Sequence, residues 1–134
     1  MTATKEQNIS VVQKGVGEFI KGNIPGMLDT CDDDIVWTTN QNPAVPFAKT
    51  YKGKSGARQF FNDLNGNVEF TDFSPEKYWG DDDMVFVKTH EAAIVKKTGK
   101  KYDHEMLMSF KVRNGKIVEF FAYVDSADQE RAFA

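Results

Sequence analysis

Residues 84–124, MVFVKTHEAAIVKKTGKKYDHEMLMSFKVRNGKIVEFFAYV, decide the fold of this chain. Apolar and polar residues alternate along most of this stretch, which is the pattern of strands that bury one face. Two short turn sequences, Thr98-Gly99 and Asn114-Gly115, interrupt the alternation. Asn-Gly between alternating runs is the strongest short-range signal for a β-hairpin, because both turn residues must adopt positive φ. The pattern predicts three consecutive antiparallel strands, over residues 84–97, 100–113 and 116–124.

The first turn also predicts which side chains share a face, because side chains alternate along a strand with a period of two. A two-residue loop at this turn places Glu91 opposite Met106. The resulting face is almost wholly apolar, and its polar members are Thr89, Glu91 and His104. Glu91 and His104 are then diagonal neighbours, about 7–8 Å apart at the backbone. An acid and an imidazole on an apolar face are the first candidates for chemistry in this sequence.

The second turn leaves two registers open for the last strand. A clean two-residue turn at Asn114-Gly115 pairs His104 with Asp125, which would give an imidazole oriented by an acid. A three-residue or bulged turn shifts the strand by one residue and points Asp125 outward. The inward-facing residues of the last strand are then Val118, Phe120, Ala122 and Val124.

Length and composition bound the class of protein. A chain of 134 residues is long enough for one domain with a real core, and we expect a single domain over residues 1–134. The net charge is −3 with no basic cluster, which argues against a nucleic-acid partner. The single Cys31 excludes an internal disulfide and offers no metal cluster, so we expect no metal and no cofactor. With no apolar run of about 18 residues and no secretion signal, we expect no membrane partner and a cytoplasmic location.

The segments before and after the hairpin complete the expected order of elements. Apolar residues recur at helical spacing over residues 5–21, over residues 24–31, and from residues 53–55 to Gly66. A strand is expected at residues 35–39, and residues 68–79, which contain Pro75, are expected to form one bent strand or two short ones at a sheet edge. Residues 126–134 are expected to form a brief closing helix.

Two glycines, Gly15 and Gly17, lie inside the first expected helix. Each costs about 1 kcal/mol relative to alanine in a helix interior. Either they are weak positions in a packed helix, or another element or a ligand comes close to the helix backbone.

Helices followed by a run of antiparallel strands predict an α+β fold. We expect a curved, cone-shaped antiparallel sheet with about three helices packed on its concave face. The interior of the cone would be the apolar face described above, and such interiors hold small molecules.

A series of short motifs resembles one family over nearly the whole chain. The motifs are Gly22-Asn23-Ile24, Asp34-Ile35-Val36-Trp37, Tyr51-Lys52-Gly53 ahead of Phe60-Phe61, Thr98-Gly99, Asn114-Gly115-Lys116-Ile117 and Tyr123-Val124-Asp125. Their order and spacing are similar to the SnoaL-like branch of the nuclear-transport-factor-two-like superfamily, which includes ketosteroid isomerase, polyketide cyclases and limonene epoxide hydrolase. The resemblance implies a cystatin-like α+β barrel and the shifted register of the last strand. It does not imply one activity, because the fold hosts many functions.

The catalytic positions of these relatives are mostly changed here. The resemblance places Thr39 where ketosteroid isomerase has its carboxylate base, and Gly15 and Met108 where it has its oxyanion-hole Tyr and Asp. Ala122 falls where limonene epoxide hydrolase has an acid that activates water. One acid position is matched by Glu91, which the register independently turns inward. The mechanisms of both enzymes are therefore disfavoured.

Two functions remain in view for the cone. One is an isomerase, cyclase or dehydratase that acts by acid–base chemistry on an enolisable small hydrophobic molecule, with His104 as the base and Glu91 as the acid or orienting group. The other is a non-catalytic pocket or a dimeric interaction module, in which Glu91 and His104 only satisfy each other. The expected pocket residues are Phe19, Trp37, Thr39, Phe61, Thr89, Met106, Met108, Phe120, Ala122 and Val124, with Asp125 as a further candidate.

The resemblance also implies a homodimer formed through the outer face of the sheet. In the shifted register this face carries several large apolar groups, as a buried partner surface would. They are Phe86, Ile94, Leu107, Phe121 and Tyr123, together with His90.

Overall fold

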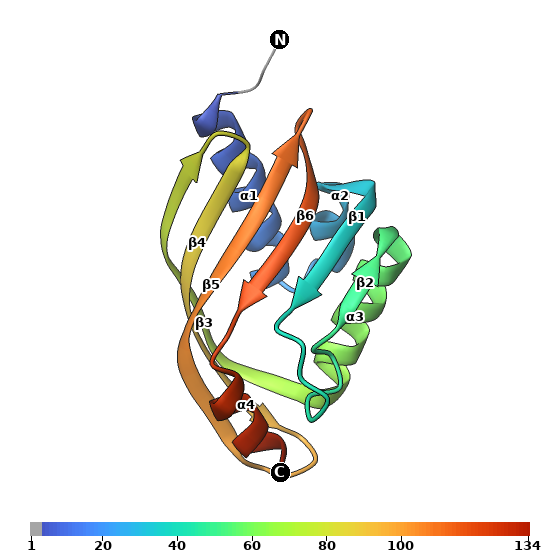
Figure 1. Cartoon of the computed structure of the whole chain (residues 1–134), viewed down its shortest axis with the longest axis vertical. Coiled ribbons are helices and arrows are strands. Elements are labelled where there is room, and N and C mark those ends of the chain that lie inside the picture. Colours follow the sequence, from blue (N-terminus) through green and yellow to red (C-terminus); the bar gives the residue numbers. More distant parts are fainter. Residues whose placement is uncertain (1–3) are drawn as a thin grey trace.

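The computed structural model describes residues 4–134, so the first three residues of the expected domain lie outside the described residues. Its elements follow the predicted order, except for a short strand at Thr50–Lys52 that was not predicted (Figure 1). They are α1 (Lys5–Ile20), α2 (Ile24–Asp29), β1 (Cys31–Thr39), β2 (Thr50–Lys52), α3 (Gly53–Asn67), β3 (Val68–Asp81), β4 (Met84–Val95), β5 (Lys101–Arg113), β6 (Lys116–Tyr123) and α4 (Ser126–Phe133). The second helix is shorter than predicted, and β1 begins at Cys31 and not at residue 35.

The six strands form one curved sheet in the order β2-β1-β6-β5-β4-β3. Helices α1, α2 and α3 lie on one side of this sheet, and α4 lies near the tip formed by the β4–β5 loop (Figure 1). The predicted α+β cone is confirmed, although the sheet stays open at β2 and β3. The prediction of a purely antiparallel sheet is wrong, because β1 pairs with β6 in parallel. β1 is remote from the hairpin in sequence, so the hairpin pattern says nothing about where it docks.

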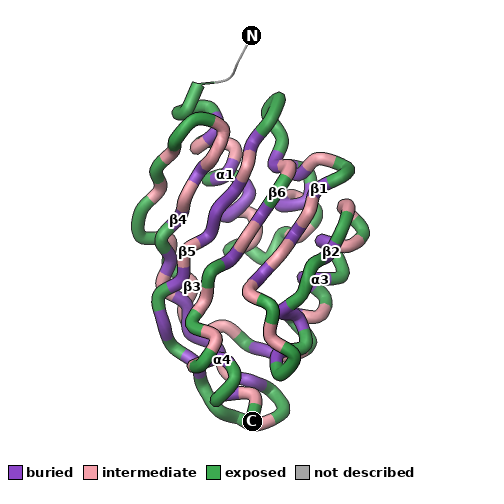
Figure 2. The backbone as a smooth tube through the Cα atoms, viewed as in Figure 1, coloured by how far each residue is buried: buried purple, intermediate pink, exposed green. Residues whose placement is uncertain are grey.

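The predicted strand run forms the centre of the sheet. Burial alternates along β4 and β5, as Figure 2 shows, and the inward side chains join those of the helices in one core. Of the two alternatives for residues 68–79, the single edge strand is confirmed. It is β3, at the edge of the sheet, and its pairing with β4 shifts at two irregularities, one of them directly after Pro75.

The register of the β4–β5 hairpin differs from the prediction by two residues. Glu91 lies directly opposite His104, not opposite Met106. The favoured two-residue turns need positive φ at the first position, and one of the two types needs it at both. Here Gly99 adopts a φ of 73°, but the β-branched Thr98 does not adopt a positive φ, so the loop is longer. A shift of two residues keeps every side chain on its predicted face.

Of the two forms left open for the β5–β6 turn, the two-residue form is the one observed, with φ of 53° at Asn114 and 76° at Gly115. The one-residue shift occurs within the strand, at a bulge that contains Val118. Ile117 before the bulge and Phe120 after it are both buried. Val118 was expected on the inner face in this register, but it sits in the bulge and is only half-buried. The shifted register therefore holds from the bulge onward.

Helix α1 packs closely on α2 at Gly15. A Cβ atom at this position would lie 2.9 Å from both Met27 Sδ and Thr30 Oγ1. Apart from its chain neighbours and the backbone of its own helix, no atom in the described part of the chain lies within 4 Å of a Cβ placed at Gly17. Close approach of another element therefore explains Gly15, whereas Gly17 is a weak position in the helix.

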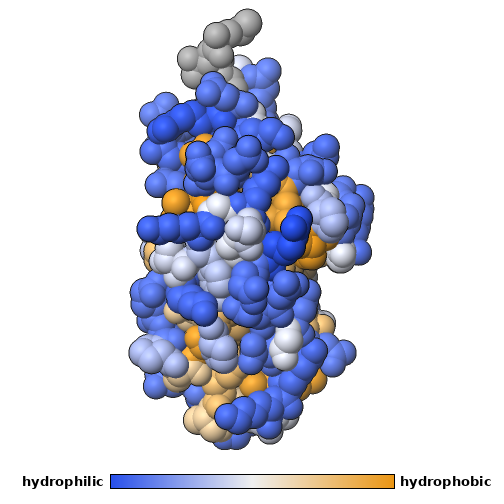
Figure 3. Space-filling model, turned by 90° about the vertical axis from the view of Figure 1, so that its right-hand side faces the viewer, coloured by the Kyte–Doolittle hydropathy of each residue, from blue (hydrophilic) through white to orange (hydrophobic). Residues whose placement is uncertain are grey.

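The last feature of the fold is the polarity of its surface. The side of the molecule seen in Figure 3 is mostly hydrophilic, with hydrophobic residues exposed in separate patches. Among the helices of residues 4–134, none is long and apolar enough to cross a membrane.

Candidate functional site

A cavity of about 70 Å³ lies inside the cone, between the helices and the inner face of the sheet. Its lining is apolar except for Thr39, Glu91, Tyr102 and Gln129. Of the side chains expected to line a pocket, these border the cavity: Phe19, Trp37, Thr39, Phe61, Met106, Met108, Phe120, Ala122 and Val124. The remaining one, Thr89, is fully buried on β4.

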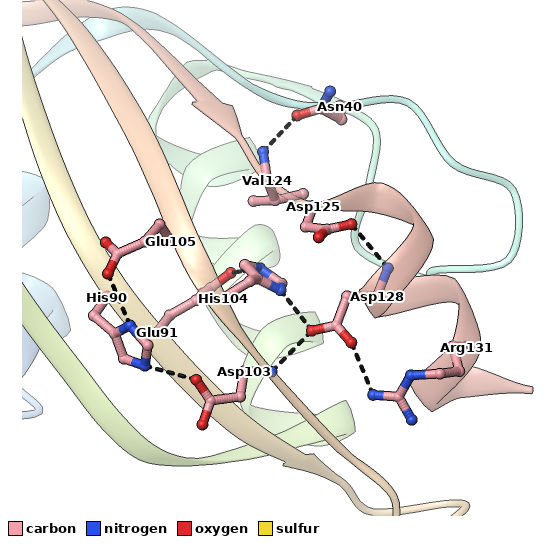
Figure 4. Close-up of polar contacts among 10 residues, drawn as sticks. All are labelled: Asn40, His90, Glu91, Asp103, His104, Glu105, Val124, Asp125, Asp128 and Arg131. Carbon is pink, nitrogen blue, oxygen red and sulfur yellow. Dashed lines mark hydrogen bonds and ion pairs between the residues drawn. The ribbon is translucent and has the colours of Figure 1, made fainter.

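The two candidate catalytic residues contact each other. Glu91 on β4 and His104 on β5 are directly opposed across the strand pair, and their exposed fractions are 4% and 9%. His104 Nε2 lies 2.8 Å from Glu91 Oε2 (Figure 4). Glu91 borders the cavity, whereas His104 lies behind it. The acid is therefore the member of the pair that a molecule in the cavity would meet.

The second nitrogen of His104 is bound by an acid that the sequence did not indicate. His104 Nδ1 lies 2.9 Å from Asp128 Oδ2, on helix α4 (Figure 4). Both partners of the imidazole are carboxylates, which accept hydrogen bonds, so the protonated ring satisfies both. Burial disfavours the charged ring, but the hydrogen bonds to Glu91 and Asp128 raise the pKa of His104 above its usual value.

Asp128 is held by three donors. Arg131 Nη2 lies 2.8 Å from its Oδ1, and the backbone N–H of Asp103 donates to its Oδ2 over 2.9 Å. Burial alone would raise the pKa of Asp128, but the hydrogen bonds from Arg131, His104 and Asp103 lower it to about 2. Charges therefore alternate from Glu91 through His104 and Asp128 to Arg131.

Asp125, the further candidate from the sequence, caps α4. Its side chain is exposed and accepts a hydrogen bond from the backbone N–H of Asp128 over 3.0 Å. The spacing Asp125-x-x-Asp128 at the start of a helix is the one signal that could have placed Asp128 in its first turn. Asp125 thus does not meet His104 but helps to position the acid that does.

Tyr102 adds a hydroxyl group to the same end of the cavity. Its ring stacks on the His104 imidazole with centroids 5.3 Å apart. Burial, and then the negative charge of Glu91, raise the pKa of Tyr102 well above its usual value, so the hydroxyl stays protonated. A neutral donor thus stands beside a carboxylate at the cavity wall, which is an arrangement suited to proton transfer.

The other histidine, His90, lies on the outer face of the sheet. Its Nε2 is 2.7 Å from Asp103 Oδ1 and its Nδ1 is 3.1 Å from Glu105 Oε1 (Figure 4). Within residues 4–134, no group of three or more His, Cys, Asp and Glu side chains is arranged to hold a metal ion.

Comparison with known proteins gives the same fold. The family model described as SnoaL-like domain matches residues 12–120. An NTF2-like protein from Burkholderia xenovorans LB400 is 21% identical over 98% of each chain, with a TM-score of 0.89. A protein assigned as a SnoaL-like polyketide cyclase from Mesorhizobium loti is 22% identical over 86% of this chain and 97% of its own, with a TM-score of 0.73.

An LEH-like epoxide hydrolase from M. tuberculosis is 16% identical over 96% of this chain and 90% of its own, with a TM-score of 0.75. At these identities the structural similarity shows a shared fold and nothing further. No curated protein matches the sequence significantly.

Proposed function

The chain belongs to the SnoaL-like domain family, and from this premise we propose that its cavity binds a small hydrophobic molecule and promotes acid–base chemistry on it. The reaction class is removal of a proton from a carbon beside a carbonyl group, as in isomerisation, aldol-type cyclisation or dehydration. One observation carries the proposal: Glu91, a buried carboxylate, forms part of the wall of an otherwise apolar cavity.

Glu91 takes the role of the base, which the sequence had suggested for His104. Both nitrogens of His104 are bound by carboxylates, and Glu91 is the residue that borders the cavity. His104 holds one carboxylate oxygen of Glu91 and leaves the other to a bound molecule. His104 is therefore a positioning residue, and it preorganises the base for the reaction.

The proposed step balances without an oxidant or a reductant. The proton moves from the α-carbon to Glu91, and the C–H electron pair forms the enolate. The hydroxyl of Tyr102 is the donor available to the enolate oxygen at this end of the cavity. If the Glu91 carboxyl first exchanges this proton with solvent and then protonates the same carbon, the result is exchange of the α-proton. If Glu91 delivers the proton to a conjugated carbon instead, the result is isomerisation.

The test is exchange of α-protons for deuterium, followed by NMR on a panel of enolisable ketones that includes 2-tetralone. We expect Glu91→Gln to slow the exchange at least about 100-fold. Glu105→Gln, which makes the same change on the outer face, is the matched control and should keep the rate. His104→Gln should lower the rate less and change its pH profile. Equal exchange by the wild type and Glu91→Gln would remove Glu91 as the base.

A binding protein without turnover is the second candidate. It is favoured by Thr39, Met108 and Ala122, which stand where the resemblance places catalytic groups of related enzymes. Met106 and Met108 would supply an adaptable lining for an apolar ligand. A compound that raises the melting temperature but never exchanges its α-protons would favour this candidate over the first.

We also propose that a second copy of the chain covers the outer face of the sheet. Two aromatic pairs lie there, Trp79 with Phe86 and Phe121 with Tyr123, and Tyr123 is 50% exposed. Exposed aromatic clusters favour a partner surface, and a twofold homodimer is the simplest partner. Light scattering at micromolar concentration should give a dimer, and Tyr123→Glu should shift it to monomer. A wild-type monomer would contradict the proposal.

A further inference from the structure

Three residues that border the cavity each carry a buried polar atom with no hydrogen-bond partner among residues 4–134: Trp37 Nε1, Thr39 Oγ1 and the Tyr102 hydroxyl. All three side chains are buried. Buried polar groups are almost always paired in folded proteins, so an unpaired one calls for a ligand atom or an ordered water. Asn8 Oδ1 and Thr89 Oγ1 are also unpaired within this range, but these residues do not border the cavity. Three of the five residues in this range with an unpaired buried polar atom thus border the cavity.

These atoms lie in two different parts of the wall. Tyr102 on β5 is a diagonal neighbour of Glu91 on the inner face. Trp37 and Thr39 lie two residues apart on β1, which β6 and β5 separate from β4. Ala122 on β6 pairs with both Thr39 and Met108, whereas Glu91 pairs with His104. Along β5, the positions of Thr39 and Glu91 are therefore four residues apart. That separation is about 13 Å along the strands. The cavity therefore has an acid end and a second polar end.

The second polar end has a defined chemistry. An indole N–H can only donate, so the partner of Trp37 must be a hydrogen-bond acceptor. The surroundings are flat rings: Trp37 stacks on Phe120 with centroids 3.9 Å apart and also contacts Phe60 and Phe61. Aromatic walls favour a flat ring between them.

We propose that Trp37 and Thr39 form a second polar subsite, which binds an acceptor oxygen of a flat, ring-containing ligand. This oxygen is a carbonyl, ether or phenolic oxygen on the part of the ligand remote from the carbon that Glu91 deprotonates. The inference rests on the proposed function for the place of the reacting carbon, but the subsite itself is a matter of binding.

A ring-sized ligand requires the cavity to expand. Its volume is about 70 Å³, whereas an engineered cavity that accepts benzene measures about 150 Å³. Met106 and Met108 line the wall between the two polar ends. Their unbranched side chains can change rotamer more easily than branched ones, so they are the groups that make room.

The test compares two enolisable ketones of matched shape, 6-methoxy-2-tetralone and 6-ethyl-2-tetralone, by isothermal titration calorimetry. Only the first carries an acceptor oxygen remote from the ketone. We expect the wild type to bind the methoxy compound on the order of tenfold more tightly, since the ethyl compound leaves a buried donor unpaired. Trp37→Phe removes the N–H and keeps a ring, and Thr39→Val removes the hydroxyl at nearly constant shape. The affinity ratio should fall toward one in both variants.

The ratio cancels any general loss of affinity in a variant, because both ketones experience it. A wild-type ratio of one, or a ratio unchanged in both variants, would overturn the subsite and leave its atoms to ordered water only. Failure of both ketones to bind would also overturn it, because the subsite should supply affinity to the methoxy compound. Glu91→Gln separates the two proposals: it should abolish proton exchange and retain the ratio.

Discussion

At the scale of single residues, His104 decides the electrostatics of the cavity. Burial disfavours the charged imidazolium, but a carboxylate accepts from each of its nitrogens. The pKa of His104 is raised because these hydrogen bonds outweigh burial. The ring is thereby used as a charged link between Glu91 and Asp128, and it has no free nitrogen with which to act as a base.

We expect the stability of the fold to decline at alkaline pH through His104. A histidine whose pKa is raised by folding stabilises the fold fully below its unfolded pKa of about 6.5, and this contribution is lost as pH rises through the folded pKa. NMR titration of the His104 ring should give a midpoint above 6.5. In urea unfolding, the free energy of unfolding should fall less for His104→Gln than for the wild type as the pH is raised above 6.5.

His90 must be separated from His104 in that experiment. Its hydrogen bond to Glu105 raises the pKa of His90 as well. Burial opposes this effect, and the hydrogen bond to Asp103 adds to it. The His90→Gln variant removes this second titration and assigns the NMR signals. A midpoint below 6.5 for His104 in that variant would contradict the prediction.

The Glu91–His104 pair should show strong coupling in a double-mutant cycle. Removal of one partner of a buried ion pair leaves an unpaired charge and costs about 3–5 kcal/mol, whereas an apolar replacement of both partners costs less. Glu91→Leu with His104→Leu should therefore be at least about 1 kcal/mol more stable than the sum of the two single changes implies. Chemical denaturation measures the three variants. Additivity within about 0.5 kcal/mol would show that the pair is not coupled.

At the scale of elements, the two glycines of α1 should respond in opposite ways to alanine. Gly17→Ala meets no neighbour and should stabilise the protein by about 0.5–1 kcal/mol through helix propensity. Gly15→Ala places its Cβ 2.9 Å from Met27 Sδ and Thr30 Oγ1, and Thr30 is itself fixed by a hydrogen bond to the Met27 carbonyl. We expect it to be destabilising in thermal unfolding. Equal stabilisation by both changes would contradict the close approach of α2.

Helix α4 is attached to the sheet partly through the charge cluster, which consists of Glu91, His104, Asp128 and Arg131. Asp128 bonds His104, Arg131 donates to the Lys101 carbonyl over 2.7 Å, and Thr98 donates to the Ala132 carbonyl over 2.6 Å. We expect Asp128→Asn to loosen α4 and to lower the pKa of His104, because one of its two carboxylate partners becomes neutral.

Hydrogen exchange measures this loosening, and amides of α4 should exchange faster in Asp128→Asn than in the wild type. Glu130→Gln, which makes the equivalent change at an exposed position of the same helix, is the matched control. Protection of α4 that is identical in both variants would show that the charge cluster does not hold the helix.

At the scale of the whole molecule, the cavity is smaller than the ligands the proposals require. Met108 is 4% exposed and lines it. We expect Met108→Ala to destabilise the protein by about 2–4 kcal/mol and to enlarge the cavity. Addition of 2-tetralone should then raise the melting temperature of the variant more than that of the wild type. Leu107→Ala, on the outer face, should show no such gain, and an equal ligand response in the two variants would count against the cavity as the binding site.

Much of this architecture follows from local sequence. Alternation in β4 and β5 assigns side chains to faces, and a period of two means that the two-residue error in register left those faces unchanged. Glu91, His104, Met106 and Met108 could therefore be placed inside before the pairing was known. The Asn114-Gly115 turn was predictable because its backbone conformation suits these two residue types.

The sequence by itself thus determined the helices, every strand except β2, the order of these elements and the inward face of the hairpin, since periodicity and turn chemistry are properties of neighbouring residues. Only the tertiary structure decided which groups meet across the chain. It brought Asp128, 24 residues from His104, onto the imidazole by docking α4, and it placed β1 in parallel beside β6. It also brought Trp37 and Thr39, each with an unpaired buried polar atom, to the border of the cavity. These contacts depend on how distant elements pack, and no local pattern encodes that choice.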